Sequence, residues 1–303
     1  MKASALMVAL AGSIAVASAQ QPAAPLAQEL RHALDRQLQS AVEGLDGVMG
    51  YAALDLTSGE EIGRLDRQEF PTASTIKLAI LYELFRQADE GKLRLDAAAA
   101  LDRTKVVGGS GILHALGAPQ LSLRDHAVLM MTLSDNTATN VLIDRVTIPA
   151  VAARMQSLGL TAIRLRRKMM DAAATARGDE NVAAPRDIVR LLRVLYAGEG
   201  LKAESKAGPL TILEIGAARA YLRPGIPAGI PVLSKSGELE GVRVDAAIVR
   251  AAHRPYAIAV MTTYLKDEVE GERAITSVSR AFYEYFSRLG FGSEHGRQLK
   301  RPS

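Results

Sequence analysis

Two groups of β-prone segments lie at opposite ends of this 303-residue chain, and mostly helical sequence separates them. Near the start, Val48–Leu56 and Glu61–Leu65 flank the turn Thr57-Ser58-Gly59. Near the end there are three more runs: Val232–Lys235, Val242–Ala252 and Tyr256–Thr263. Short apolar runs bounded by turn residues are typical of strands. Because a strand must pair with another strand, we expect the two ends of the chain to meet in one antiparallel sheet.

The rest of the chain has the spacing of amphipathic helices. The predicted helices are Gln28–Val42, Ser74–Gln87, Leu123–Leu133, Ile148–Leu158, Pro185–Tyr196, Thr211–Tyr221 and Glu272–Leu289. The predicted fold is therefore α/β (α+β), with an antiparallel sheet of about five strands flanked by helices. We expect a single domain over residues 20–303. Its α/β lobe would comprise about residues 20–72 and 208–303, and an inserted all-α lobe about residues 73–207.

Residues 1–19 have the pattern of a secretory signal peptide. Lys2 precedes the apolar run Ala3–Val16, and Ala17-Ser18-Ala19 supplies a small-residue cleavage site. The apolar run is too short to span a bilayer as a helix. We therefore expect cleavage before Gln20, a periplasmic or secreted protein, and no stable membrane anchor.

The composition excludes several classes of function. The chain has no cysteine, and therefore no disulfide and no thiolate nucleophile or metal ligand. Its net charge is +4, with basic and acidic residues interspersed, which argues against nucleic-acid binding. The five histidines show no metal-ligand spacing, so we expect no metal and no other cofactor. We found no sign of oligomerisation in the sequence and expect a monomer.

Three short polar motifs carry the candidate chemistry. In Ser74-Thr75-Ile76-Lys77, the hydroxyl and the amine would share one face of a helix. A desolvated lysine near a helix N-terminus has a lowered pKa and can take a proton from serine. Ser134-Asp135-Asn136 ends an apolar run, where polar residues must cap a helix or line a cleft. Lys235-Ser236-Gly237 offers a cation, a hydroxyl and a backbone that a substrate can approach. Each motif alone also fits a purely structural role.

The order SxxK, SDN and K[ST]G is the motif set of class A β-lactamases and penicillin-binding proteins. The chain resembles this family over nearly its whole length after residue 19. The segments that carry the resemblance are FPTASTIK (70–77), LSDNTATN (133–140), GDENVAAP (178–185) and KSGELEG (235–241). The resemblance implies a serine β-lactamase/transpeptidase-like fold, with the active site in the cleft between the lobes. The implied substrate is a small-molecule β-lactam or a peptidoglycan-derived D-Ala-D-Ala compound.

The same resemblance gives three residues a role in acylation. Ser74 would attack the lactam carbonyl, and Lys77 would be its base or part of its proton relay. Ser134 would pass a proton to the leaving lactam nitrogen. Backbone N–H groups of Ser74 and Glu238 would form the oxyanion hole.

Five further residues would bind or border the substrate. Lys235 and Ser236 would hold the substrate carboxylate, and Asn136 would bind the amide of the substrate's side chain. Gly237 would allow close approach to the strand. Arg243 resembles the family's arginine that supports carboxylate binding, a placement that depends on a one-residue choice of alignment.

The segment Arg164–Asn181 departs from the family pattern. In class A enzymes this loop carries a glutamate and, four residues later, an asparagine, which hold the deacylating water. Here Met169, or Met170 with a one-residue slip, falls at the glutamate position, and alanine falls at the asparagine position. Neither side chain can take a proton from water. Asp171 is the nearest candidate base. Its alternative role is a structural ion pair with one of the three arginines between positions 164 and 167.

Three functions remain open on the sequence. The first is a class A-like β-lactamase that hydrolyses the lactam amide and uses another group for deacylation. The second is a penicillin-binding D,D-peptidase or esterase-like hydrolase with slow β-lactam turnover. The third is a vestigial binding or sensor module, which is the least favoured because every acylation residue is present.

Overall fold

The computed structural model describes residues 25–216, 220–293 and 295–299 of the chain. The predicted signal peptide and the cleavage site before Gln20 lie outside these ranges. Within them, no helix combines the length and the hydropathy that crossing a bilayer requires.

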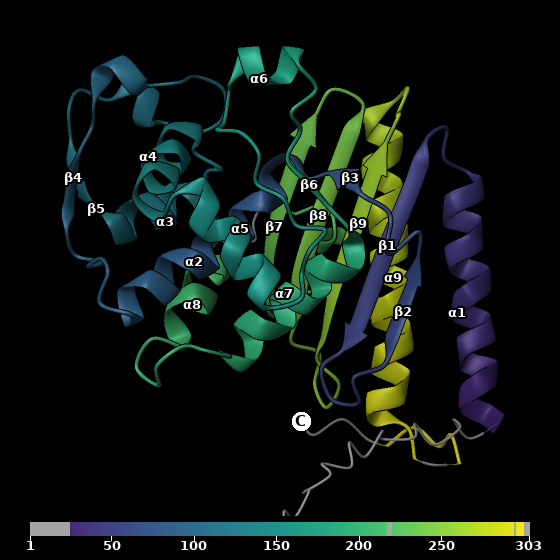
Figure 1. The fold of residues 1–303 in the computed structure, drawn as a ribbon. Helices are drawn as coiled ribbons and strands as arrows, with labels where there is room; N and C mark the ends of the chain where they lie inside the picture. Colours follow the sequence, from purple (N-terminus) through teal and green to yellow (C-terminus); the bar gives the residue numbers. More distant parts are fainter. Residues whose placement is uncertain (1–24, 217–219, 294, 300–303) are drawn as a thin grey trace, which may run out of the picture.

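A five-stranded antiparallel sheet joins the two ends of the chain (Figure 1). Its strands are β1 (Val48–Asp55), β2 (Glu61–Arg64), β7 (Val232–Leu239), β8 (Val242–Val249) and β9 (Tyr256–Thr263). Their spatial order is β2-β1-β9-β8-β7. β1 pairs with β9 along its whole length, from Val48 opposite Thr263 to Asp55 opposite Tyr256. This arrangement confirms the predicted fold class, and it leaves β7 with one unpaired edge.

Helices cover both faces of the sheet (Figure 1). α1 (Pro25–Glu43) and α9 (Glu268–Phe291) pack against each other on one face, where Tyr51 of β1 contacts Phe282 edge-to-face. α7 (Pro185–Ala197) covers the other face along β1 and β9, although it lies in the segment assigned to the α lobe. Burial on both faces explains why the strands read as continuous apolar runs rather than as alternating ones.

The remaining α-helices of the described chain lie beside the sheet (Figure 1). They are α2 (Lys77–Asp89), α3 (Leu123–Thr132), α4 (Asn136–Val146), α5 (Ile148–Ser157), α6 (Ala172–Ala176) and α8 (Ala207–Gly216). Most of α8 falls in the segment assigned to the α/β lobe. Two small ladders pair β3 (Phe70–Pro71) with β6 (Val182–Ala183), and β4 (Ala98–Ala100) with β5 (Gln120–Ser122). Short 3₁₀ turns are η1 (Ala73–Ile76), η2 (Arg103–Lys105), η3 (Leu113–Ala115) and η5 (Arg223–Gly225).

Several elements differ from the sequence prediction: α4, α6 and the short strands β3, β4, β5 and β6 were not predicted, and one helix is shifted along the chain. Helix α4 was not predicted, because much of its buried side is polar: Asn136, Thr137 and Asn140 are all buried. Hydrophobic periodicity cannot detect such a helix. The helix predicted at Thr211–Tyr221 begins earlier, at Ala207, because Pro209 falls in its first turn, where proline is tolerated. It is described as far as Gly216, and residues 217–219 of the prediction lie outside the described ranges.

Candidate active site

The candidate nucleophile Ser74 lies in the single turn η1, directly before α2 and against the edge strand β7. A Cβ atom added to Gly237 of β7 would lie 2.5 Å from the backbone nitrogen of Ser74. Only glycine therefore allows the strand to approach the nucleophile this closely. The expected role of Gly237, close approach of a substrate to the strand, stays a prediction.

A chain of hydrogen bonds links the first two motifs. The Ser134 hydroxyl donates to Ser74 Oγ at 2.8 Å. Lys77 Nζ donates to Ser134 Oγ at 3.0 Å, to the Ser134 carbonyl at 2.7 Å and to Asn136 Oδ1 at 3.3 Å. The lysine thus reaches the nucleophile through the second serine. Such a chain can move a proton between Ser74 and Lys77.

Burial sets the charge of the two lysines. Lys77 is fully buried, and this burial, together with the positive charge of Lys235, lowers the pKa of Lys77 well below its usual range. Lys77 is therefore suited to accept a proton as a neutral amine. Burial also lowers the pKa of Lys235, to about 8, while Asp245 and Glu238 act in the opposite direction. Lys235 therefore remains mostly positive at neutral pH.

Ser74 lies at the junction of two cavities. The smaller cavity, of about 340 Å³, is also lined by Ser134, Lys235 and Ser236. The larger, of about 850 Å³, is also lined by Asn136. The three predicted motifs thus converge on one cleft between the sheet and the α lobe.

Three residues of this cleft have strained backbones. Ala73, Ser134 and Met170 adopt positive φ angles of 44°, 54° and 57°. Such angles cost about 1–3 kcal/mol for residues other than glycine, and they cluster at functional sites. Ala73 and Met170 line the larger cavity and Ser134 lines the smaller one. The strain therefore supports this cleft as the functional site.

Arg243 is not brought into the cleft. Its guanidinium donates to Glu272 at 3.0 Å and to the backbone carbonyls of Leu239 and Val242. Glu272, rather than Arg243, lines the smaller cavity. The arginine can therefore influence this cavity only by neutralising its ion-pair partner.

Sequence reasoning missed Tyr221, which also lines the smaller cavity. Its hydroxyl donates to Glu238 Oε2 at 3.0 Å. Burial, and the nearby carboxylate of Glu238, raise the pKa of Tyr221. The tyrosine is therefore a neutral hydrogen-bond donor, and no local sequence pattern marks it as such.

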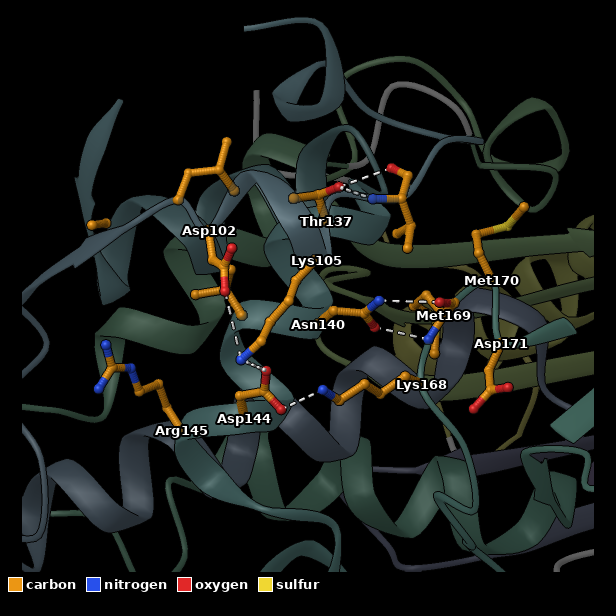
Figure 2. A pocket seen from close by; sticks show the side chains of 14 residues that line it. Asp102, Lys105, Thr137, Asn140, Asp144, Arg145, Lys168, Met169, Met170 and Asp171 are labelled. Atoms are coloured by element: carbon orange, nitrogen blue, oxygen red, sulfur yellow. Dashed lines mark hydrogen bonds and ion pairs between the residues drawn. The ribbon is translucent and has the colours of Figure 1, made fainter. Parts of the chain in front are cut away.

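Sequence reasoning also missed Asn140, which fixes the loop at Met169 (Figure 2). The Asn140 side chain accepts a hydrogen bond from Met169 N at 2.8 Å and donates one to Met169 O at 3.0 Å. Met169 is 8% exposed and Met170 is 56% exposed, and both line the larger cavity. These two hydrogen bonds hold the apolar side chain of Met169 on the wall of the cleft.

The structure does not bring Asp171 to Ser74. Its carboxylate accepts the Ala174 backbone N–H at 2.9 Å and so caps α6. Asp171 lines a neighbouring cavity, and no hydrogen bond or ion pair joins it to the other residues drawn there (Figure 2). Lys105, Asp144, Arg145 and Lys168 line the same cavity.

The alternative ion pair of Asp171 is not observed either, because no cation of the described chain lies within ion-pair distance of this carboxylate. Two of the candidate arginines have other partners: Arg164 pairs with Glu69, and Arg167 pairs with Glu180 at 2.9 Å. Asp171 is therefore a helix-capping residue in this structure.

The cleft between the sheet and the helical lobe contains a buried lysine that is joined through one serine to a second serine. This arrangement is typical of serine hydrolases that work by acyl transfer. Residues 33–286 match the model of the β-lactamase enzyme family, and the chain belongs to this family. It is a serine β-lactamase-like hydrolase.

Relatives agree with this membership. The β-lactamase SME-1 of Serratia marcescens is 26% identical over 255 residues, which are 81% of this chain and 86% of SME-1. An imipenem-hydrolysing β-lactamase of Enterobacter cloacae is 27% identical over 254 residues, which are 80% of this chain and 86% of that enzyme.

Solved structures show the same fold. PBP-A has a TM-score of 0.78 and 29% identity over 85% of this chain and 97% of PBP-A. A single-substitution variant of PBP-A, in an acyl-enzyme complex with penicillin G, has a TM-score of 0.77 and 28% identity over 85% of this chain and 97% of that chain. A β-lactamase from Sphaerobacter thermophilus has a TM-score of 0.75 and 31% identity over 82% of this chain and 95% of that chain.

Proposed function

We propose that this hydrolase is acylated readily at Ser74 by β-lactams and is deacylated slowly. The observation that carries the proposal is the contrast at Ser74: a complete proton relay lies on one side, and Met169 is clamped on the other. The acyl-enzyme of the PBP-A variant with penicillin G supports the same first step for this chain.

In the acylation step, Ser74 Oγ attacks the lactam carbonyl. Its proton moves through the Ser134 hydroxyl to the neutral amine of Lys77, along the hydrogen bonds described above. The C–N bond of the lactam breaks, and the proton returns through Ser134 to the lactam nitrogen. We assign the developing oxyanion to the backbone N–H groups of Ser74 and Glu238, because Gly237 lets these two segments approach closely.

Three side chains orient the substrate in this scheme. Lys235 supplies a positive charge, and Ser236 a hydroxyl, for the substrate carboxylate in the smaller cavity. Asn136 lines the larger cavity and would meet the amide of the acyl side chain, although its Nδ2 currently donates to the Gly108 carbonyl at 3.2 Å.

Deacylation needs a base that can activate water. The thioether of Met169 cannot accept a proton, and the Asp171 carboxylate faces another cavity. Lys77 is the remaining group connected to Ser74, and we assign the slow release of the acyl group to it. A slow step of this kind also suits the alternative function, a penicillin-binding D,D-peptidase or esterase.

Mixing the purified protein with a chromogenic cephalosporin tests the proposal. We expect a burst of product equal to the enzyme concentration, an adduct on Ser74 by mass spectrometry, and then slow turnover. Ser74→Ala should abolish both signals. Fast turnover without an accumulating adduct would contradict slow release. The absence of both adduct and turnover would leave the vestigial binding module.

We also propose that residues 1–19 direct export to the periplasm or the medium and that the exported protein is a monomer. The charged start, apolar run and small-residue site of this segment support export. Cell fractionation and the mass of the mature N-terminus would test the first point, and light scattering the second.

A further inference from the structure

The two ends of the Ser74 cleft differ in charge. At one end, Lys235 is a buried cation, and two carboxylates line the same cavity. Glu272 is neutralised by Arg243, and Glu238 lines both cavities. At the other end, the described residues that line the larger cavity include three carboxylates and a single guanidinium, and no other ionisable side chain. These residues are Glu180, Glu238, Glu240 and Arg167. The formal charge of the larger cavity is therefore −2 at neutral pH.

Two of these carboxylates have no cationic partner. Arg167 donates to both carboxylate oxygens of Glu180, at 3.2 Å and 2.9 Å, and so cancels that charge. Glu238 accepts a hydrogen bond from the neutral hydroxyl of Tyr221, and no cation of the described residues pairs with Glu238 or Glu240. Both are exposed and stand two residues apart where β7 ends. Glu238 acts electrostatically on Lys235 but forms no ion pair with it, so an incoming ligand would meet negative charge at both residues.

The walls between these carboxylates are apolar. Met169, Met170, Leu239 and Val242 line the same cavity. The cavity thus offers an apolar surface with negative charge at its rim, next to the nucleophile. An apolar group that carries an ammonium near its acyl carbonyl complements both properties.

We propose that the cleft selects acyl donors whose acyl side chain combines an apolar body with a positive charge. This inference rests on the proposed function, in which Ser74 takes the acyl group of a β-lactam. With the substrate carboxylate held at Lys235, the acyl side chain enters the larger cavity and passes Glu238 and Glu240. A positive charge on it is attracted, and a negative charge is repelled.

Three penicillins with one common phenylacetyl frame test this selection. Ampicillin carries an α-ammonium, benzylpenicillin a hydrogen and carbenicillin a carboxylate at the same carbon. The quantity to measure is the second-order rate constant of acylation, at about pH 6.5, where an α-amino group is mostly protonated. We expect this rate constant to decrease from ampicillin to benzylpenicillin to carbenicillin. At low salt, ampicillin should react at least about tenfold faster than carbenicillin. About 0.5 M salt should reduce this ratio severalfold.

Neutral isosteres assign the effect to the two carboxylates and cancel intrinsic differences in reactivity among the penicillins. In the double variant Glu238→Gln/Glu240→Gln, the ampicillin-to-carbenicillin ratio should fall at least about fivefold relative to the unmodified protein. Each single variant should give part of this fall. The matched control is Glu204→Gln, because Glu204 is exposed and lines neither of the two cavities at Ser74.

The possible failures are distinguishable. If all three penicillins acylate Ser74 in no charge order, or if the ampicillin-to-carbenicillin ratio is unchanged in the double variant, the selection is overturned while the proposed function stands. If none of them forms an adduct, the proposed function fails, and the selection fails with it.

Discussion

The two walls that face Ser74 differ in what their buried side chains can do. The wall formed by α2 and the start of α4 buries Lys77, Asn136 and Asn140, and every one of these polar groups has a hydrogen-bond partner. The wall formed by the 164–181 loop presents Met169 and Met170 instead. The first wall can move a proton and the second cannot. On the proposed function, one wall carries the relay for acylation, and the other presents no carboxylate that could speed release of the acyl group.

Removing the base from the polar wall should have the largest effect. In Lys77→Gln, no neutral amine can take the Ser74 proton, so acylation should slow by about a thousandfold. Stopped-flow acylation by the chromogenic cephalosporin measures this loss. Thermal unfolding of the same variant serves as the control for folding. An acylation rate within about tenfold of the original would show that the relay does not depend on Lys77.

Adding a base to the apolar wall should have the next largest effect, in the opposite direction. Met169→Glu places a carboxylate on the clamped part of the loop, and loss of the acyl adduct should become about a hundredfold faster. Intact-mass spectrometry over time measures the adduct. Met169→Gln is the matched control, because it is polar but cannot act as a base, and it should leave release slow. If the acyl adduct is lost at the same rate in both variants, slow release does not result from the missing base at position 169.

The pH profile of acylation should separate the roles of the two lysines. Lys77 must be neutral, so the rate should rise as pH increases through its lowered pKa. Lys235 must be positive to hold the substrate carboxylate, so the rate should fall above pH about 8, by about tenfold per pH unit. Lys235→Arg should move only the alkaline limb to higher pH. An unchanged alkaline limb in this variant would mean that another group titrates there.

The smallest effect is expected at Asp171. Asp171→Ala removes the cap of α6 and should lower the free energy of unfolding by about 1 kcal/mol. Asp171→Asn keeps a good cap and should be nearly neutral. Denaturant unfolding measures both, and the deacylation rate should stay unchanged in each. Trapping of the acyl-enzyme by Asp171→Asn would instead identify Asp171 as the deacylation base.

Much of the fold could be predicted from the sequence, because its strands and most of its helices follow hydrophobic patterns. The motifs around Ser74, Ser134 and Lys235 could be recognised because their order along the chain is informative. Helix α4 could not be predicted, because polar residues fill its buried side. Asn140 forms hydrogen bonds with Met169, 29 residues away, and Tyr221 with Glu238, 17 residues away. No local sequence pattern reveals such distant partners. The direction of the Asp171 side chain could not be predicted, because it lies in an irregular loop. Local sequence patterns do not give side-chain directions in such loops.

The pairing of β1 with β9 has a consequence for when the site comes into existence. Ser74 is positioned by Gly237 of β7, and β7 belongs to a sheet that is complete only when strands about 200 residues apart have met. A chain still being synthesised has no β9 to close that sheet. On the proposed function, covalent labelling by a fluorescent penicillin would therefore report that the sheet has closed. The rate at which labelling appears would measure how fast the sheet forms.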